Sequence, residues 1–151
     1  MTWEPDWARV TAETLEVSDH LDAVADPRCG AVVTFLGQIR DHDPGAEGEV
    51  TGIAYSAHPD ATAALERIAR EVVAGAVPHE DVRHEEVVRL AVSHRVGDLA
   101  VGDLALVACV ATAHRALAQD LCRELVERIK VELPVWKKQH TADGASHWVG
   151  L

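Results

Sequence analysis

Apolar residues along the chain follow two patterns with different periods. Residues 31–39 (AVVTFLGQI) and 104–112 (LALVACVAT) are apolar runs rich in β-branched residues, a pattern typical of strands. The second run is apolar throughout, so we expect a central strand that is covered on both faces. Residues 116–131 instead show a period of four, which predicts a helix with one apolar stripe, formed by Leu117, Leu121, Leu125 and Ile129.

The rest of the chain predicts shorter elements. A helix is expected around residues 18–25, and an amphipathic helix begins at Pro59 and runs to about Ala74. Residues 41–49 are a polar loop containing glycine and proline, and residues 94–98 (HRVGD) are typical of a turn. Further strands are expected at residues 50–56 and 86–93, and Pro134 is followed by two possible short edge strands, at 135–136 and 147–149.

This order of elements predicts an α+β fold, with two main helices packed on a mostly antiparallel sheet. Strands that follow one another through short links favour antiparallel pairing, whereas a parallel sheet would need a helix between each pair. A chain of 151 residues suits one compact domain, so we expect residues 1–151 to form it, with residues 1–29 as an acidic N-terminal segment.

The net charge of −11 narrows the possible partners. It argues against nucleic acid and against anionic membrane surfaces, but it leaves room for a small anion in a local basic pocket. No apolar run approaches the roughly 20 residues that span a bilayer, and the N-terminus lacks the features of a signal peptide, so a cytoplasmic protein is expected. The three cysteines form neither a disulfide framework nor a zinc pattern, and no metal site or cofactor is expected.

Every lysine of the chain lies in the stretch KVELPVWKKQH, at residues 130–140. The three lysines Lys130, Lys137 and Lys138 stand beside one glutamate, which gives this stretch a formal charge of +2 and leaves the rest of the chain at −13. All other cationic side chains are arginines. A lysine amine, unlike a guanidinium, can lose its proton and act as a base or nucleophile. A catalytic role and chance clustering are both open on composition alone.

Two further cationic groups are candidates for binding an anion. Arg40 follows the first predicted strand, with His42 two residues later, and His114 and Arg115 stand where the last helix begins. Free N–H groups and a partial positive charge at a helix N-terminus favour an anion, and arginine adds a planar fork that suits phosphate or carboxylate. Because a cation opposes the helix dipole there, the alternative of a solvated helix start remains open for Arg115.

Four segments together resemble one family, the large catalytic subunit of molybdopterin synthase. They are GAVVTFLGQIRDHDPG (30–45), SHRVGDLAVGD (93–103), TAHRALA (112–118) and KVELPVWKKQ (130–139). The resemblance implies an α/β-hammerhead-like fold and a sulfurtransferase that converts cyclic pyranopterin monophosphate (precursor Z) to molybdopterin in molybdenum cofactor biosynthesis. It also implies a sulfur donor, a small ubiquitin-like subunit with a C-terminal Gly-Gly thiocarboxylate, and a heterotetramer built around a homodimer of large subunits.

The resemblance assigns roles to particular residues. Lys130 and Lys137 become the catalytic acid/base candidates, and Lys130 is expected closest to the terminal glycine of the donor. Substrate contacts are expected from Arg40, His114, Arg115, Lys138, Gln38, Ile39, Gln139 and Phe35. The chain departs from the family pattern at Gln38, at Gln139, which stands where lysine or glutamate is more usual, and in the strand IAYSAH (53–58).

Helix geometry predicts that the site is shared between two protomers. Arg115 and Lys130 are fifteen residues apart, which is roughly 22 Å along a helix. A small pterin cannot easily reach both, so we expect His114 and Arg115 from one protomer and Lys130 and Lys137 from its partner. The alternative to an enzyme is a non-catalytic module that binds an anionic ligand or a ubiquitin-like tail.

Overall fold

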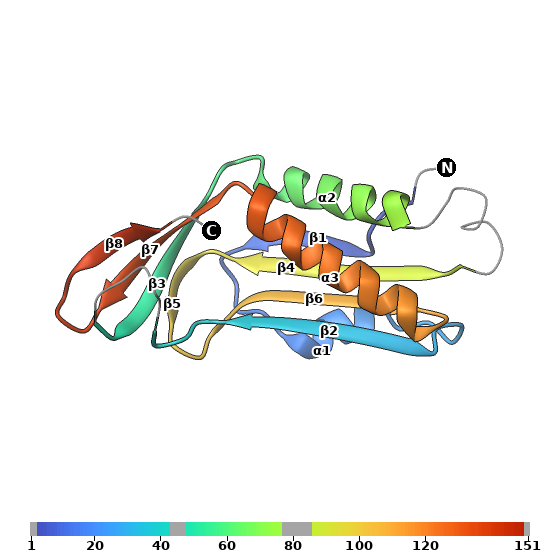
Figure 1. Cartoon of the computed structure of the whole chain (residues 1–151), viewed down its shortest axis with the longest axis horizontal. Coiled ribbons are helices and arrows are strands. Elements are labelled where there is room, and N and C mark those ends of the chain that lie inside the picture. Colours follow the sequence, from blue (N-terminus) through green and yellow to red (C-terminus); the bar gives the residue numbers. More distant parts are fainter. Residues whose placement is uncertain (1–2, 43–47, 77–85, 150–151) are drawn as a thin grey trace.

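A computed structural model describes residues 3–42, 48–76 and 86–149 of the chain (Figure 1). Within these ranges the helices are α1 (Val17–Ala23), α2 (Ala61–Ala76) and α3 (Arg115–Glu132). The strands are β1 (Trp7–Thr11), β2 (Ala31–Gln38), β3 (Val50–Ala57), β4 (Val88–Arg95), β5 (Gly97–Ala100), β6 (Leu104–Thr112), β7 (Val135–Thr141) and β8 (Ser146–Val149). The α+β class expected from the pattern is confirmed.

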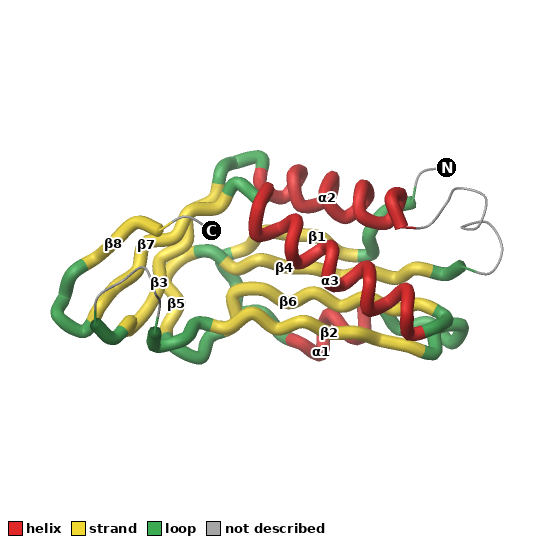
Figure 2. The backbone as a smooth tube through the Cα atoms, in the orientation of Figure 1, coloured by secondary structure: helices red, strands yellow, loops and turns green. Residues whose placement is uncertain are grey.

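The strands are divided between two four-stranded sheets rather than collected in one. The first sheet has the order β1-β4-β6-β2, and the second sheet has the order β5-β3-β7-β8. Every strand pairing is antiparallel except that of β1 with β4, which is parallel. Figure 2 shows the second sheet beyond the end of the first, next to the C-terminal end of α3.

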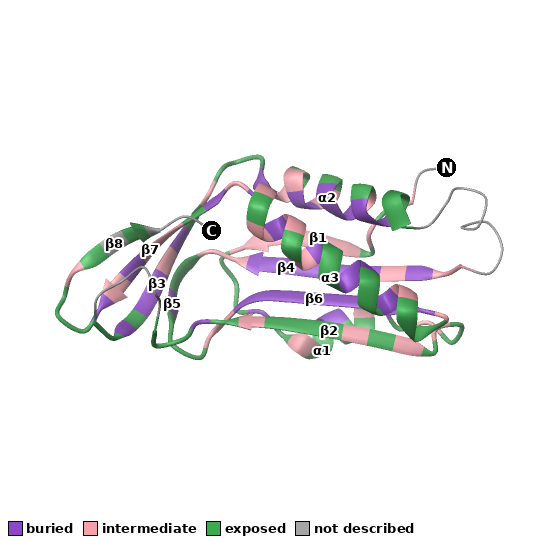
Figure 3. Ribbon diagram, in the orientation of Figure 1, coloured by how far each residue is buried: buried purple, intermediate pink, exposed green. Residues whose placement is uncertain are grey.

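The core lies on both faces of the first sheet. Helices α2 and α3 cover one face, where Leu65, Ile68, Leu125 and Ile129 are fully buried. The short helix α1 covers part of the other face, in a smaller cluster around Val107. Figure 3 shows β6 buried along its length between these layers, which confirms the central strand predicted at residues 104–112.

The chain passes from the first sheet to the second between β4 and β5. The prediction of a turn at residues 94–98 was wrong in part, because β4 continues through Arg95 and β5 begins at Gly97. A single residue, Val96, separates the two strands, and Gly97 has φ +97°. This left-handed conformation, which glycine adopts without steric cost, lets the chain change direction so sharply.

Two further strands differ from the sequence-based expectation. The prediction of a short edge strand at residues 135–136 was wrong: β7 runs to Thr141 and lies between β3 and β8, whereas β8 is the expected edge strand. The acidic N-terminal segment also contains β1, which was not predicted, together with α1. None of the helices in the described ranges has both the length and the apolar character needed to cross a bilayer.

Candidate active site

A small polar cavity of about 130 Å³ lies where the two sheets and α3 meet. Four parts of the chain contribute to its wall: the end of β2 with the segment that follows it, β3, the last turn of α3, and β7. The described residues that line it are Gln38, Ile39, Arg40, His42, Val50, Ile53, Tyr55, Lys130, Lys137 and Gln139.

Strand pairing explains why the side chains from β3 and β7 share the cavity. In the register of these strands Ile53 pairs with Gln139 and Tyr55 pairs with Lys137. Paired residues lie on the same face of a sheet, and alternate residues of one strand do as well. All four side chains therefore project from one face of the second sheet, which is the face turned toward the end of α3.

The described residues that line the cavity carry positive charge and include no aspartate or glutamate. Arg40 offers a planar donor array for an anion. Burial lowers the pKa of the Lys130 amine below its ordinary value, and the positive charge of Lys137 lowers that pKa further. An amine shifted in this direction releases its proton more readily near neutral pH, as acid–base catalysis requires.

Gln139 adds an uncharged hydrogen-bonding group to the cavity. Its side chain is fully buried, and neither its amide nitrogen nor its amide oxygen has a hydrogen-bond partner among the described residues. An unpaired buried amide costs free energy, and a ligand that offers both a donor and an acceptor would remove that cost.

The structure brings together six of the residues predicted for the site. Lys130, Lys137, Arg40, Gln38, Ile39 and Gln139 all line the cavity. Lys138 does not line this cavity, because strand alternation turns it to the opposite face of the second sheet. There its amine lies 5.4 Å from the centre of the Trp148 ring.

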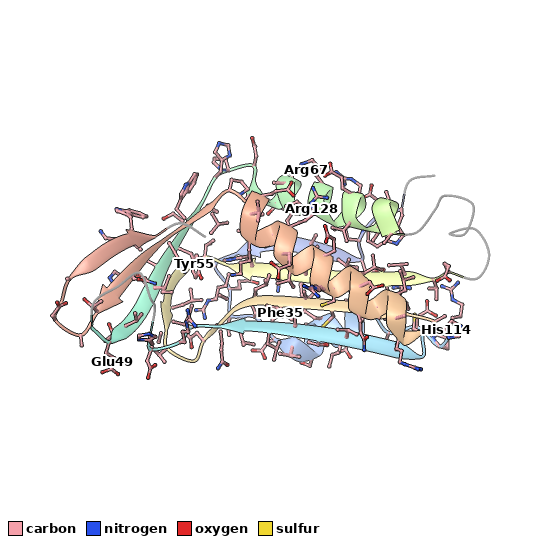
Figure 4. The ribbon with its side chains drawn as sticks, in the orientation of Figure 1. Phe35, Glu49, Tyr55, Arg67, His114 and Arg128 are labelled. Atoms are coloured by element: carbon pink, nitrogen blue, oxygen red, sulfur yellow. The ribbon has the colours of Figure 1, made fainter. Side chains whose placement is uncertain are left out.

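The remaining three predicted residues lie away from the cavity. His114 is the N-cap of α3 and Arg115 its first residue, whereas Lys130 is in the last turn. Figure 4 shows His114 at one end of the molecule's first sheet and Tyr55, in β3 of the second sheet, past the other end. Phe35 lines a separate groove of about 300 Å³ between β2 and α3, together with Cys122 and Val126. One protomer does not assemble all of the predicted residues around a single cavity.

Sequence reasoning did not single out three of the lining residues, Val50, Ile53 and Tyr55. Val50 and Ile53 are buried apolar residues that pack into the main core, so nothing in their type marked them as lining residues. Tyr55 is the single tyrosine of the chain and alternates with Ile53 along β3. That alternation was visible in the sequence, but the pairing of β3 with β7, which joins them to the lysines, was not.

The fold and this site define an α+β protein with a small cationic cavity at the junction of its two sheets. The chain belongs to the MoaE protein family, whose model matches residues 10–132. It is 38% identical to molybdopterin synthase catalytic subunit 1 of Mycobacterium tuberculosis over 95% of this chain and 90% of that relative.

Solved structures agree with this membership. Molybdopterin synthase from Staphylococcus aureus superposes with a TM-score of 0.81 and 26% identity, covering 97% of this chain and 98% of that one. A protein–protein complex of subunits 1 and 2 of molybdopterin-converting factor from Helicobacter pylori contains a chain with the same fold, with a TM-score of 0.69 and 19% identity, covering 93% of this chain and 88% of that one.

Proposed function

We propose that this chain, acting as one domain, is the catalytic subunit of a molybdopterin synthase. In this reaction sulfur passes from the C-terminal thiocarboxylate of a small ubiquitin-like subunit to precursor Z, and the dithiolene of molybdopterin is formed. The observation that carries the proposal is the cavity in which Arg40, Lys130 and Lys137 meet. Membership of the MoaE protein family supports it.

The chemistry of the two reactants matches the residues around the cavity. Precursor Z carries a phosphate and the donor tail ends in an anionic thiocarboxylate, so both need cations. Arg40 would hold an anionic group, while Lys130 and Lys137 would exchange protons as the thiocarboxylate sulfur displaces an oxygen from the pterin side chain and water replaces sulfur at the donor carbon, which becomes a carboxylate. The cysteines of the chain need not react, because the sulfur arrives on the partner subunit.

A second protomer would complete the site with His114, Arg115 and Phe35. β2 is an edge strand of the first sheet and exposes Val32 and Leu36 on one face and Phe35 on the other, an apolar edge that a second copy of the chain would cover. Antiparallel pairing of two β2 strands would bring the start of one strand beside the end of the other. Gly30, just before β2, bonds to the carbonyl of Ala113, so His114 would approach the partner's cavity.

The alternative function is a module that binds an anion or a ubiquitin-like tail without turnover. Binding alone would be served by arginines, which the chain uses elsewhere. A partly buried lysine with a lowered pKa instead favours proton exchange, and therefore the enzyme.

A reconstituted assay separates the two functions. The purified protein is mixed with precursor Z and the thiocarboxylated small subunit, and molybdopterin is followed as its fluorescent oxidised derivative. Lys130→Ala and Lys130→Arg should each lower turnover by roughly 100-fold or more, because neither side chain exchanges a proton near pH 7. Val131→Ala, one residue further on the same helix and 84% exposed, is the matched control and should keep full turnover.

Two results would contradict the proposal. Wild-type protein that binds the small subunit and forms no product would favour the binding module. Turnover that survives in Lys130→Arg would show that a fixed positive charge suffices at this position, and the proposed proton transfer by Lys130 would then be wrong.

A further inference from the structure

His94 is a fully buried residue near the end of β4, close to the point where the chain leaves the first sheet. Its Nδ1 lies 2.8 Å from the backbone carbonyl oxygen of Arg95. A carbonyl can only accept a hydrogen bond, so Nδ1 must donate its proton. In the neutral ring the other nitrogen, Nε2, therefore carries a lone pair, and this buried atom has no partner among the described residues.

A second buried histidine shows what a purely structural role looks like in this chain. Both ring nitrogens of His20 are paired, with the carbonyl of Glu16 at 2.7 Å and with the hydroxyl of Ser93 at 2.8 Å. His94 is as fully buried but only half paired. Because an unpaired buried acceptor destabilises a fold, the lone pair of His94 requires an explanation that His20 does not.

One neighbour of His94, Tyr55, also lines the cavity. The ring meets Tyr55 edge to face, with 4.9 Å between centroids, and Tyr55 lines the cavity beside Lys130. Burial lowers the pKa of His94 to about 4, and the positive charge of Lys130 contributes to that shift, so the ring is neutral at neutral pH. The other titratable groups lining the cavity are Arg40, His42 and Lys137.

We propose that His94 is a positioning residue for Lys130, whose amine donates a hydrogen bond to one water molecule that in turn donates to the His94 Nε2 lone pair. The four-carbon stem of lysine is flexible, and a fixed acceptor behind Tyr55, which itself lines the cavity, would select one orientation of its amine. The same bond favours the ammonium form and so opposes part of the effect of burial. This inference rests on the proposed role of Lys130 in proton exchange.

Two variants distinguish the effect of the Nε2 acceptor from the effect of the rest of the His94 ring. His94→Asn keeps an amide N–H near the Nδ1 position, where it can still bond to Arg95, but it removes the acceptor. His94→Gln reaches the Nε2 position and can restore an acceptor there. Because the chain has three lysines, selective ¹³C-lysine labelling gives three side-chain signals, which Lys→Ala variants assign. The titration of each amine can then be followed by NMR without any substrate.

In His94→Asn the Lys130 signal should titrate about one pH unit lower than in the wild type, because the ammonium loses its acceptor. His94→Gln should recover at least half of this shift. Lys138 lies on the opposite face of the second sheet and should titrate unchanged in both variants, as an internal control. A change confined to overall folding would not move one lysine signal and leave another in place.

Three results would overturn the inference. They are an unchanged Lys130 titration in His94→Asn, an equal shift in both variants, and a wild-type ¹⁵N-histidine spectrum with the proton on Nε2. The last measurement needs no variant, so it holds even if the substitutions impair folding. None depends on turnover, so loss of the proposed function in the reconstituted assay would be a separate result.

Discussion

Arginine and lysine occupy different kinds of position in this protein. Arginines form ion pairs on the surface, such as Arg128 with Glu71 at 2.6 Å and Arg89 with Asp6 at 2.9 Å. Two of the three lysines instead line the cavity, and burial lowers the pKa of one of them, Lys130. A guanidinium holds its proton under all working conditions, whereas an amine can release it. A lysine at position 130 thus fits the proton exchange proposed there.

The buried ring of His94 should make stability depend on pH. Its pKa falls from 6.5 to about 4 in the folded state, so between these values the unfolded chain binds a proton that the folded chain does not. Stability contributed by the neutral ring is therefore present above pH 6.5 and is lost as the pH falls toward 4, by up to about 3 kcal/mol.

Urea unfolding of the wild type and His94→Asn at pH 7 and pH 4.5 measures this contribution. The free energy of unfolding should fall more steeply with decreasing pH in the wild type than in His94→Asn, since carboxylates and His20 are common to both proteins. Parallel pH profiles would contradict the assignment.

At the scale of elements, β3 illustrates how tightly the second sheet is assembled. A Cβ atom at Gly52 would lie 2.7 Å from the backbone carbonyl oxygen of Leu99, a residue of the neighbouring strand β5. Glycine is required here by the close approach of two strands. At Gly75 in α2, no described residue outside the glycine's own helix places an atom within 4 Å of the corresponding position, so this glycine serves as a contrast.

Gly52→Ala and Gly75→Ala should change stability in opposite directions. Gly52→Ala should lower the free energy of unfolding by about 2 kcal/mol, because the methyl group forces β3 and β5 apart. Gly75→Ala should raise it by about 0.5 kcal/mol, because alanine favours the helix and restricts the unfolded chain. Chemical denaturation of the two variants beside the wild type tests this, and changes of the same sign would contradict it.

Local pattern predicted the elements of the first sheet better than those of the second. The four-residue period of Leu121 and Leu125 reports burial against a sheet, and α3 has nearly the predicted bounds. β7 carries polar residues on both faces, because Lys137 and Gln139 line a cavity while Lys138 and His140 face away from it. Such a strand has no apolar alternation to detect. Its position between β3 and β8 depends on contacts distant in sequence.

In the candidate site, too, some residues could be predicted from local sequence and others depend on contacts between distant segments. Six predicted residues meet in the cavity, and each lies in a segment that resembles the family. Tyr55 and His94 acquire their relation to Lys130 through the packing of β3, β4 and α3. His94 also belongs to a segment that resembles the family, but the sequence alone predicted only a turn there. An unpaired ring nitrogen can be seen only when all its neighbours are placed.

At the scale of the whole molecule, the length of α3 separates the predicted site residues into two groups. Lys130 and Lys137 lie at one end of the first sheet with Arg40, and His114 and Arg115 lie at the other. The exposed apolar edge on β2 runs between these ends. In a symmetric dimer through this edge, His114 and Arg115 of each protomer would join the lysines in the cavity of the other protomer.

Mixing two inactive variants tests the shared site. Lys130→Ala and Arg115→Ala should each lack turnover alone. After the two proteins are unfolded and refolded together, half of the dimers are mixed and each contains one intact site, so turnover should return to about a quarter of the wild-type value. A mixture as inactive as its components would contradict a site built from two protomers.

Because all lysines lie within residues 130–138, covalent modification of lysine can affect only this part of the chain. Acylation of a lysine side chain removes its charge and its ability to exchange a proton. In most proteins such a modification falls on dispersed surface positions and leaves activity intact. Here every lysine available to an acyl donor lies in the segment that closes the cavity, and two of the three line it. Acylation of Lys130 or Lys137 would therefore remove a charge and a proton-exchanging group from the cavity itself.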